Sequence, residues 1–241
     1  MPSRYQVLRE DWDGCQRCDL CQWRKKVVHA RGVLPCDVFF VGEAPGASED
    51  ILGRPFAGPA GKLLDRIVAD AMRALVRLYR PAGGVAYNPP ELAFCNLIGC
   101  IPKDSPSGKV GEPSKESILA CAQRLIELVD VAQPKLVVCV GNLSEKWTPK
   151  ILEGELDRKG KAKAGGKSGG RLPGGPAAGT EQRGEDAPPA GRYRYATIIH
   201  PAAILRMSIA QQGLAYQRAV VILTECFEDL IQRGDVNAPA Q

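Results

Sequence analysis

The hydrophobic pattern alternates between short continuous apolar runs and longer segments in which apolar residues recur at helical spacing. Short runs bounded by turn residues are typical of buried strands, and the longer periodicity is typical of amphipathic helices. The predicted strands are residues 37–41, 92–98, 135–140 and 196–199. The predicted helices are residues 61–79, 114–131 and 212–233. This alternation predicts an α/β fold, a three-layer α/β/α arrangement around a central, mostly parallel four-stranded sheet.

One segment interrupts this pattern. Residues from about 155 to 191 are rich in Gly, Lys, Pro and Ala and contain almost no large apolar side chain. Such a segment buries too little surface to offset the entropy of ordering it. We therefore expect a single domain over residues 1–241 that carries a flexible insertion, because the strand pattern resumes immediately afterwards.

The charge of the chain is concentrated in that insertion. The net charge is +5, and residues 158–171 contain six basic and no acidic residues, so the remainder carries 5 − 6 = −1. The rest of the domain is thus nearly neutral, and an argument for nucleic-acid binding has to come from local sites. No apolar run approaches the roughly 18 residues that span a bilayer, and the N-terminus lacks an apolar signal region. We expect a cytoplasmic protein without a membrane partner.

Polar motifs follow the predicted strands. Gly42-Glu43 follows the first, Asn96 lies near the end of the second, Gly141-Asn142 follows the third and His200 follows the fourth. Ligands of parallel α/β sheets bind beyond the carboxyl ends of the strands, so these residues are candidates for one site. Each has a structural alternative: Glu43 can belong to an ordinary strand-to-helix turn, and a lone histidine is more often structural. The other histidine, His29, lies in a basic stretch and is expected to face solvent.

Four of the nine cysteines form a candidate metal site: Cys15, Cys18, Cys100 and Cys121. Clustered cysteines in a chain without a secretion signal favour metal binding over disulfides. Four thiolates can hold a [4Fe–4S] cluster or a tetrahedral zinc ion, and spacing does not separate the two. Cys21 and Cys95 are possible substitutes. Cys36, Cys139 and Cys226 are interpreted as ordinary buried residues.

Taken together, the motifs resemble the iron–sulfur, family-four branch of the uracil-DNA glycosylase superfamily. The resemblance covers most of the chain, in the order of the family. It rests on Cys15-x-x-Cys18; Gly42-Glu43-Ala44-Pro45-Gly46 followed by Glu49-Asp50; Gly53-Arg54-Pro55-Phe56-x-Gly58-x-x-Gly61-x-Leu63-Leu64-Asp65; Asn96-x-x-x-Cys100; Cys121; and His200-Pro201 leading to Leu205-Arg206.

The resemblance implies an enzyme that flips uracil out of single- or double-stranded DNA and hydrolyses its N-glycosidic bond, leaving an abasic site. It implies catalytic roles for Glu43, which positions the attacking water, and His200, which donates to a uracil oxygen. Phe56 would stack on uracil and Asn96 would bind its Watson–Crick edge. Gly42 and Arg206 complete the implied substrate-binding set, with Arg206 on a DNA phosphate.

The resemblance also implies a structural [4Fe–4S] cluster on the four cysteines, and we expect a monomer. The sequence departs from the family around the third cysteine, where Gly99-Cys100-Ile101-Pro102-Lys103 replaces a more basic stretch, and the segment from Cys100 to Cys121 is unusually long. Two other functions remain open. One is a catalytically weak iron–sulfur DNA-binding module in a replication or repair assembly. The other, a zinc-stabilised nucleotide-binding domain, is disfavoured by the lack of a phosphate loop.

Overall fold

A five-stranded sheet runs through the middle of the protein in the order β1-β3-β2-β4-β5. The structure, a computed structural model, describes residues 2–78, 89–105, 107–155 and 193–236. The strands are β1 (Arg31–Gly32), β2 (Val38–Gly42), β3 (Leu92–Asn96), β4 (Leu136–Val140) and β5 (Arg194–Ile198). All neighbours are parallel except β1 and β3, which are antiparallel. The predicted α/β class is confirmed, but the prediction of four strands is wrong, because the two-residue β1 is too short to leave a hydrophobic pattern.

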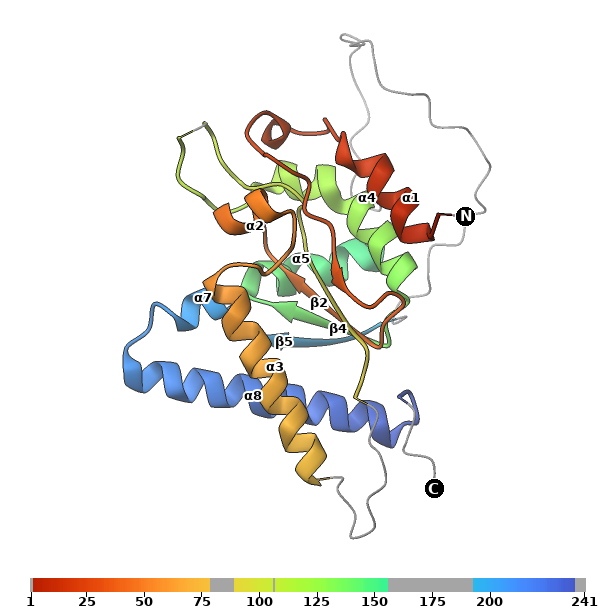
Figure 1. Cartoon of the computed structure of the whole chain (residues 1–241), viewed down its shortest axis with the longest axis vertical. Coiled ribbons are helices and arrows are strands. Elements are labelled where there is room, and N and C mark those ends of the chain that lie inside the picture. Colours follow the sequence, from red (N-terminus) through yellow and green to blue (C-terminus); the bar gives the residue numbers. More distant parts are fainter. Residues whose placement is uncertain (1, 79–88, 106, 156–192, 237–241) are drawn as a thin grey trace.

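Two long helices cover one face of the sheet, as Figure 1 shows for α3 (Pro59–Leu78) and α8 (Ile209–Gln232). Their inward side chains include Leu64, Ile67 and Phe227, all fully buried. From the sheet, Phe40 and Val138 point into the same core. The predicted helices at 61–79 and 212–233 are therefore confirmed, with starts that lie two and three residues earlier than expected.

The opposite face carries α1 (Arg4–Asp13), α4 (Lys115–Ala132) and α5 (Asn142–Leu152), which makes the third layer (Figure 1). Phe39 and Val137 lie in this second core, one position away from the residues that face α3 and α8. Successive strand residues point to opposite faces, so a sheet covered on both sides needs continuous apolar strands. The Ser114 hydroxyl accepts a bond from the Ser117 N–H at 3.1 Å, as expected of an N-cap.

The remaining elements are short: α2 (Ala47–Leu52), α7 (Pro201–Ile204) and a single 3₁₀ turn (Asp19–Gln22). Pattern analysis missed α1, α2, α5 and α7. α2 and α7 are too short to show helical periodicity, and α1 buries only Leu8 and Trp12. α5 contains Pro149, which lowers helix propensity inside a helix.

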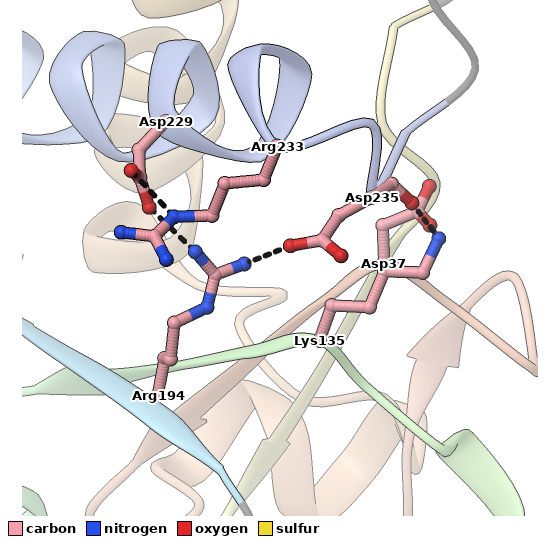
Figure 2. Close-up of polar contacts among 6 residues, drawn as sticks. All are labelled: Asp37, Lys135, Arg194, Asp229, Arg233 and Asp235. Carbon is pink, nitrogen blue, oxygen red and sulfur yellow. Dashed lines mark hydrogen bonds and ion pairs between the residues drawn. The ribbon is translucent and has the colours of Figure 1, made fainter.

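An ion-pair network fastens the end of α8 to the amino ends of the strands, opposite the edge where the polar motifs lie. Figure 2 shows Arg194 donating to Asp229 and to Asp235, both at 2.5 Å. Arg233 also donates to Asp229, and Lys135 contacts Asp37 and the carbonyl of Asp235. These side chains are partly exposed, so solvent screens each pair and the network mainly fixes where α8 ends.

The expected insertion at about residues 155–191, with its six basic residues, lies outside the described residues apart from Glu155. None of the helices in the described ranges combines the length and hydropathy required to cross a bilayer.

Candidate functional site

A cavity of about 480 Å³ opens at the carboxyl ends of β2 and β3, beside the turn that follows β5. Five of the six predicted catalytic and substrate-binding side chains line it, and these are Glu43, Phe56, Asn96, His200 and Arg206. The sixth residue, Gly42, lies directly behind the cavity wall. Residues that are more than 150 positions apart are thus brought together, because parallel strands end at one edge.

Gly42 leaves space for two of these side chains. It pairs with Asn96 across β2 and β3. A Cβ atom on Gly42 would lie 2.4 Å from Oδ1 of Asn96 and 2.5 Å from Cζ of Phe56. The amide and the ring therefore touch the bare backbone of Gly42, and any larger residue there would displace both of them.

Phe56 is held by its loop in an unusual backbone conformation. Its φ is 54°, in the left-handed region that few non-glycine residues adopt. Glu49 bridges the loop, since its carboxylate accepts bonds from the N–H groups of Gly46 at 3.0 Å and Gly58 at 2.8 Å. A Cβ on Gly61 would lie 1.9 Å from the Phe56 carbonyl oxygen, so α3 begins directly against the loop. The loop thereby presents one ring to the cavity, and this ring is in an edge-to-face arrangement with Phe94, with centroids 6.1 Å apart.

Glu43 lies at the N-terminus of α5. The Leu143 N–H donates to Oε1 of Glu43 at 3.3 Å, and the helix dipole favours a carboxylate there. Gly141, at φ 95°, allows Glu43 and His200 to lie close to the backbone. A Cβ atom on Gly141 would lie 2.6 Å from Oε1 of Glu43 and 3.0 Å from Cβ of His200. Burial raises the pKa of Glu43, the Leu143 bond opposes that shift, and Glu112 adds to it. The result is a carboxylate that takes up a proton more readily than a solvated one.

His200 is the N-cap of α7, and its ring is oriented by the backbone. The Ala202 N–H donates to Nδ1 of His200 at 3.2 Å. Because Nδ1 accepts, the neutral ring carries its proton on Nε2, which is then a free donor. Burial lowers the pKa of His200, and the charge of Arg206 lowers it further. Both effects favour the neutral imidazole.

The rim of the cavity carries opposite charges. Arg206 is exposed, and its Nε donates to the Ala202 carbonyl at 3.1 Å, which holds the guanidinium over the opening. Glu112 lines the other side, on the long segment between Cys100 and Cys121. Sequence analysis missed Glu112, because nothing in its exposed, Gly- and Pro-flanked segment indicates a site. Gly141 was noted only as part of a polar turn.

The four predicted metal-binding cysteines line a second, smaller cavity. Cys15 and Cys18 come from the segment after α1, Cys100 from the loop after β3 and Cys121 from α4. Cys21 is absent from this lining, and Cys95 is fully buried within β3. The four predicted cysteines therefore line one cavity and neither substitute does, while their role as metal ligands stays a prediction. Of the three cysteines expected to be ordinary core residues, Cys36 and Cys139 are buried and Cys226 is half-buried.

The surroundings of this cavity fit an anionic metal centre. Four metal-bound thiolates would carry negative charge, and Arg17 and Arg24 also line the cavity. Nε of Arg124 donates to Sγ of Cys121 at 3.2 Å. Burial raises the pKa of the Cys100 thiol to about 12, a shift that a coordinated cation reverses. Within the described ranges, no three His, Cys, Asp or Glu side chains are gathered closely enough to hold a metal ion as they stand.

His29 differs from its prediction. The expected solvent-facing position is wrong, because the side chain is only 3% exposed and its Nε2 lies 2.8 Å from Oδ1 of Asp13. Burial lowers its pKa to about 4. The flanking basic residues suggested a surface, but the apolar pair Val27-Val28 directly before it enters the core.

Comparison with known proteins agrees with this geometry. The sequence profile of the Uracil DNA glycosylase superfamily matches residues 31–223. The chain is 30% identical over 157 residues to the Type-4 uracil-DNA glycosylase of Saccharolobus solfataricus, covering 65% of this chain and 64% of that protein. It is 32% identical over 158 residues to the protein of the same name from Pyrobaculum aerophilum, covering 66% and 71%. The match to the Thermotoga maritima protein of that name is 29% over 136 residues, covering 56% and 61%.

The matched region spans 61–71% of these three relatives, and less than two thirds of the Saccharolobus solfataricus and Thermotoga maritima proteins. The profile covers most of the chain, including Glu43, Phe56, Asn96 and His200. The chain belongs to the uracil DNA glycosylase superfamily and, within it, to the type-4 family.

Proposed function

We propose that the protein is a DNA repair glycosylase that removes uracil from DNA and leaves an abasic site. The observation that carries the proposal is the convergence of Glu43, Phe56, Asn96 and His200 on one cavity. Its volume of about 480 Å³ is in the range of small-molecule sites, so a base flipped out of DNA can enter it.

The reaction breaks the bond between N1 of uracil and C1′ of the sugar, and the electron pair leaves with the base. Nε2–H of His200 donates to a uracil carbonyl oxygen as negative charge develops there. The Glu43 carboxylate orients a water molecule and stabilises the positive sugar. The water adds to C1′ and gives its proton to Glu43, and that proton finally balances the uracil anion that leaves. A donor that bonds most strongly in the transition state lowers the barrier, because it stabilises that state more than the ground state.

Base choice falls to Asn96 and Phe56. The amide of Asn96 offers one donor and one acceptor, which match the O4 and N3–H of uracil. Cytosine presents the reverse pattern and would leave the buried amide unpaired. The Phe56 ring supplies a flat apolar face for stacking.

We further propose that Cys15, Cys18, Cys100 and Cys121 hold a [4Fe–4S] cluster. The cluster would be structural: it ties the segment after α1 to the loop after β3 and to α4. Family membership supports this choice over zinc, whereas the arginines around the cavity suit either anionic centre. Iron analysis and absorption near about 400 nm separate the two, because zinc thiolate sites are colourless.

The substrate is uracil-containing DNA, single- or double-stranded, with Arg206 on a backbone phosphate. The protein acts as a monomer and a single domain, and the insertion at about residues 155–191 adds a sequence-independent attraction to phosphates.

The test is incubation with a uracil-containing oligonucleotide, followed by alkaline cleavage at abasic sites. Matched oligonucleotides with cytosine or thymine at the same position are the controls. Cleavage confined to the uracil strand supports the proposal. Binding without cleavage, under conditions that retain the iron, would instead support the catalytically weak DNA-binding module.

A further inference from the structure

Arg124 lies between the two cavities and is completely buried on α4. On one side, its Nε donates to Sγ of Cys121 at 3.2 Å. On the other side, its Nη2 donates to the carbonyl oxygen of Asn96 at 2.6 Å and to that of Leu97 at 3.3 Å. One side chain thus contacts a candidate cluster ligand and the backbone of the candidate base-recognition residue.

We propose that Arg124 is a positioning residue that couples the cysteine cavity to the uracil pocket. It holds the end of β3, and with it Asn96, in the position that reads the base. This inference rests on the proposed function, because it assigns Arg124 to the support of that same site.

The charge of Arg124 is the first argument. A buried guanidinium needs a negative partner, and no carboxylate in the described ranges lies within ion-pair distance of it. Its Nη1 has no partner among the described residues. On the cysteine side, its partner is Sγ of Cys121, which also accepts from the Gly99 N–H at 3.4 Å. A metal cluster held by Cys121 and the other three cysteines would supply the negative charge that this buried guanidinium lacks.

The location of the Asn96 carbonyl is the second argument. β3 ends at Asn96, and just beyond it the chain leaves the regular strand pairing. The hydrogen bond from Arg124 to the Asn96 carbonyl fixes the peptide group between Asn96 and Leu97. Oδ1 of Asn96 packs directly over Gly42, so a small rotation of that backbone moves the amide within the pocket. Precise placement matters, because shifts of about 1 Å in a reacting complex cost about 100-fold in rate.

The test compares Arg124→Met and Arg124→Lys with Leu128→Ala, all on α4. Methionine keeps an extended side chain without charge or N–H groups. Lysine keeps the charge, but its single ammonium group cannot reproduce the planar fork that bonds sulfur and carbonyl together. Leu128 is buried in the same core, so Leu128→Ala lowers stability by a cavity alone.

Three measurements are made on each iron-loaded protein: the cluster midpoint potential, hydrogen–deuterium exchange of residues 92–98, and uracil excision. Arg124→Met should have a more negative potential, because it loses a donor and a positive charge next to a cluster sulfur. It should also exchange faster at residues 92–98 and lose at least about tenfold in excision. Leu128→Ala should lower the melting temperature and leave all three near the parent values.

Parent-like potential and exchange in Arg124→Met would overturn the inference, as would equal changes in Leu128→Ala. If Arg124→Met does not assemble, Arg124→Lys carries the same test, with faster exchange at residues 92–98 expected and parent-like exchange overturning the inference. A parent protein that does not excise uracil would refute the proposed function alone, since the potential and the exchange still report on both contacts of Arg124.

Discussion

The methyl group that Gly42→Ala adds would enter the base pocket from behind. Its carbon would lie 2.4 Å from Oδ1 of Asn96 and 2.5 Å from Cζ of Phe56, where ordinary contacts begin at 3.4 Å. Both side chains would have to retreat by about 1 Å, and a displacement of that size costs about 100-fold in rate, or about 2.7 kcal/mol of barrier. The backbone of Gly42 is outside the left-handed region, so alanine adds no conformational strain.

The assay is single-turnover excision with a uracil-containing oligonucleotide, together with DNA affinity and thermal unfolding. Gly42→Ala should lose about 100-fold in excision, because it alters two side chains that would hold the base. DNA affinity should change little, since phosphate contacts supply most of it. Gly213→Ala is the matched control. It adds the same methyl group on α8, where no described atom outside the adjoining helix backbone would lie within 4 Å, and it should excise uracil at the parent rate.

Two results would refute the reasoning. If Gly42→Ala excised uracil at the parent rate, the space behind Asn96 and Phe56 would not limit catalysis. If it unfolded at a temperature far below that of the parent, the loss of activity would reflect folding. Overpacking of this kind is expected to cost about 1–3 kcal/mol, which a folded domain can tolerate.

Three other changes test neighbouring parts of the structure. His200→Ala should lower single-turnover excision by about 100- to 1000-fold with DNA binding and colour unchanged, because one oxyanion donor is lost. Burial and Glu112 raise the pKa of Glu43 above its usual 4.5, so excision should fall as the pH drops through that raised value. Glu112→Gln should move this acidic limb to lower pH in a pH–rate profile, and an unmoved limb would contradict the assignment. His29 has a folded pKa of about 4 against 6.5 when unfolded, so the unfolded state binds the proton first as the pH falls. Denaturant unfolding should therefore show about 2 kcal/mol less stability at pH 5 than at pH 7, and a His29→Leu protein should lose much of that dependence.

The central strands were predictable because each is buried on both faces and therefore continuously apolar. The run Val38-Phe39-Phe40-Val41, for example, places Phe39 in one core and Phe40 in the other. β1 was not predictable, since two residues have no periodicity and Gly32 pairs only because β3 lies beside it. α1 was not predicted because its apolar pattern is too sparse. Only Leu8 and Trp12 are buried, and its remaining residues are largely exposed.

The members of the candidate site were predictable, but their supports were not. Residues such as Glu43 and His200 follow apolar strands, and the topology of a parallel sheet brings such positions to one edge. The donors that orient them come from backbone N–H groups of Leu143 and Ala202, which carry no side-chain signal. Arg124 did leave a trace in the sequence, as a charged residue next to Leu125 on the apolar face of a helix. Its partners, however, become visible only in three dimensions.

Chain connectivity links the two cavities more directly than their separate chemistries suggest. Asn96 faces the base pocket and Cys100 faces the cysteine cavity, so three residues separate the two. The segment between them is pinned at both ends: the Leu97 N–H donates to the Gly42 carbonyl at 3.0 Å, and the Val28 N–H donates to the Gly99 carbonyl at 2.7 Å. A segment this short and hydrogen-bonded at both ends has few free backbone torsions. A displacement of Cys100 is therefore expected to move Asn96 as well. A metal centre that fixed Cys100 would therefore also restrain Asn96. The proposed cluster would then influence the proposed base recognition without taking part in bond breaking.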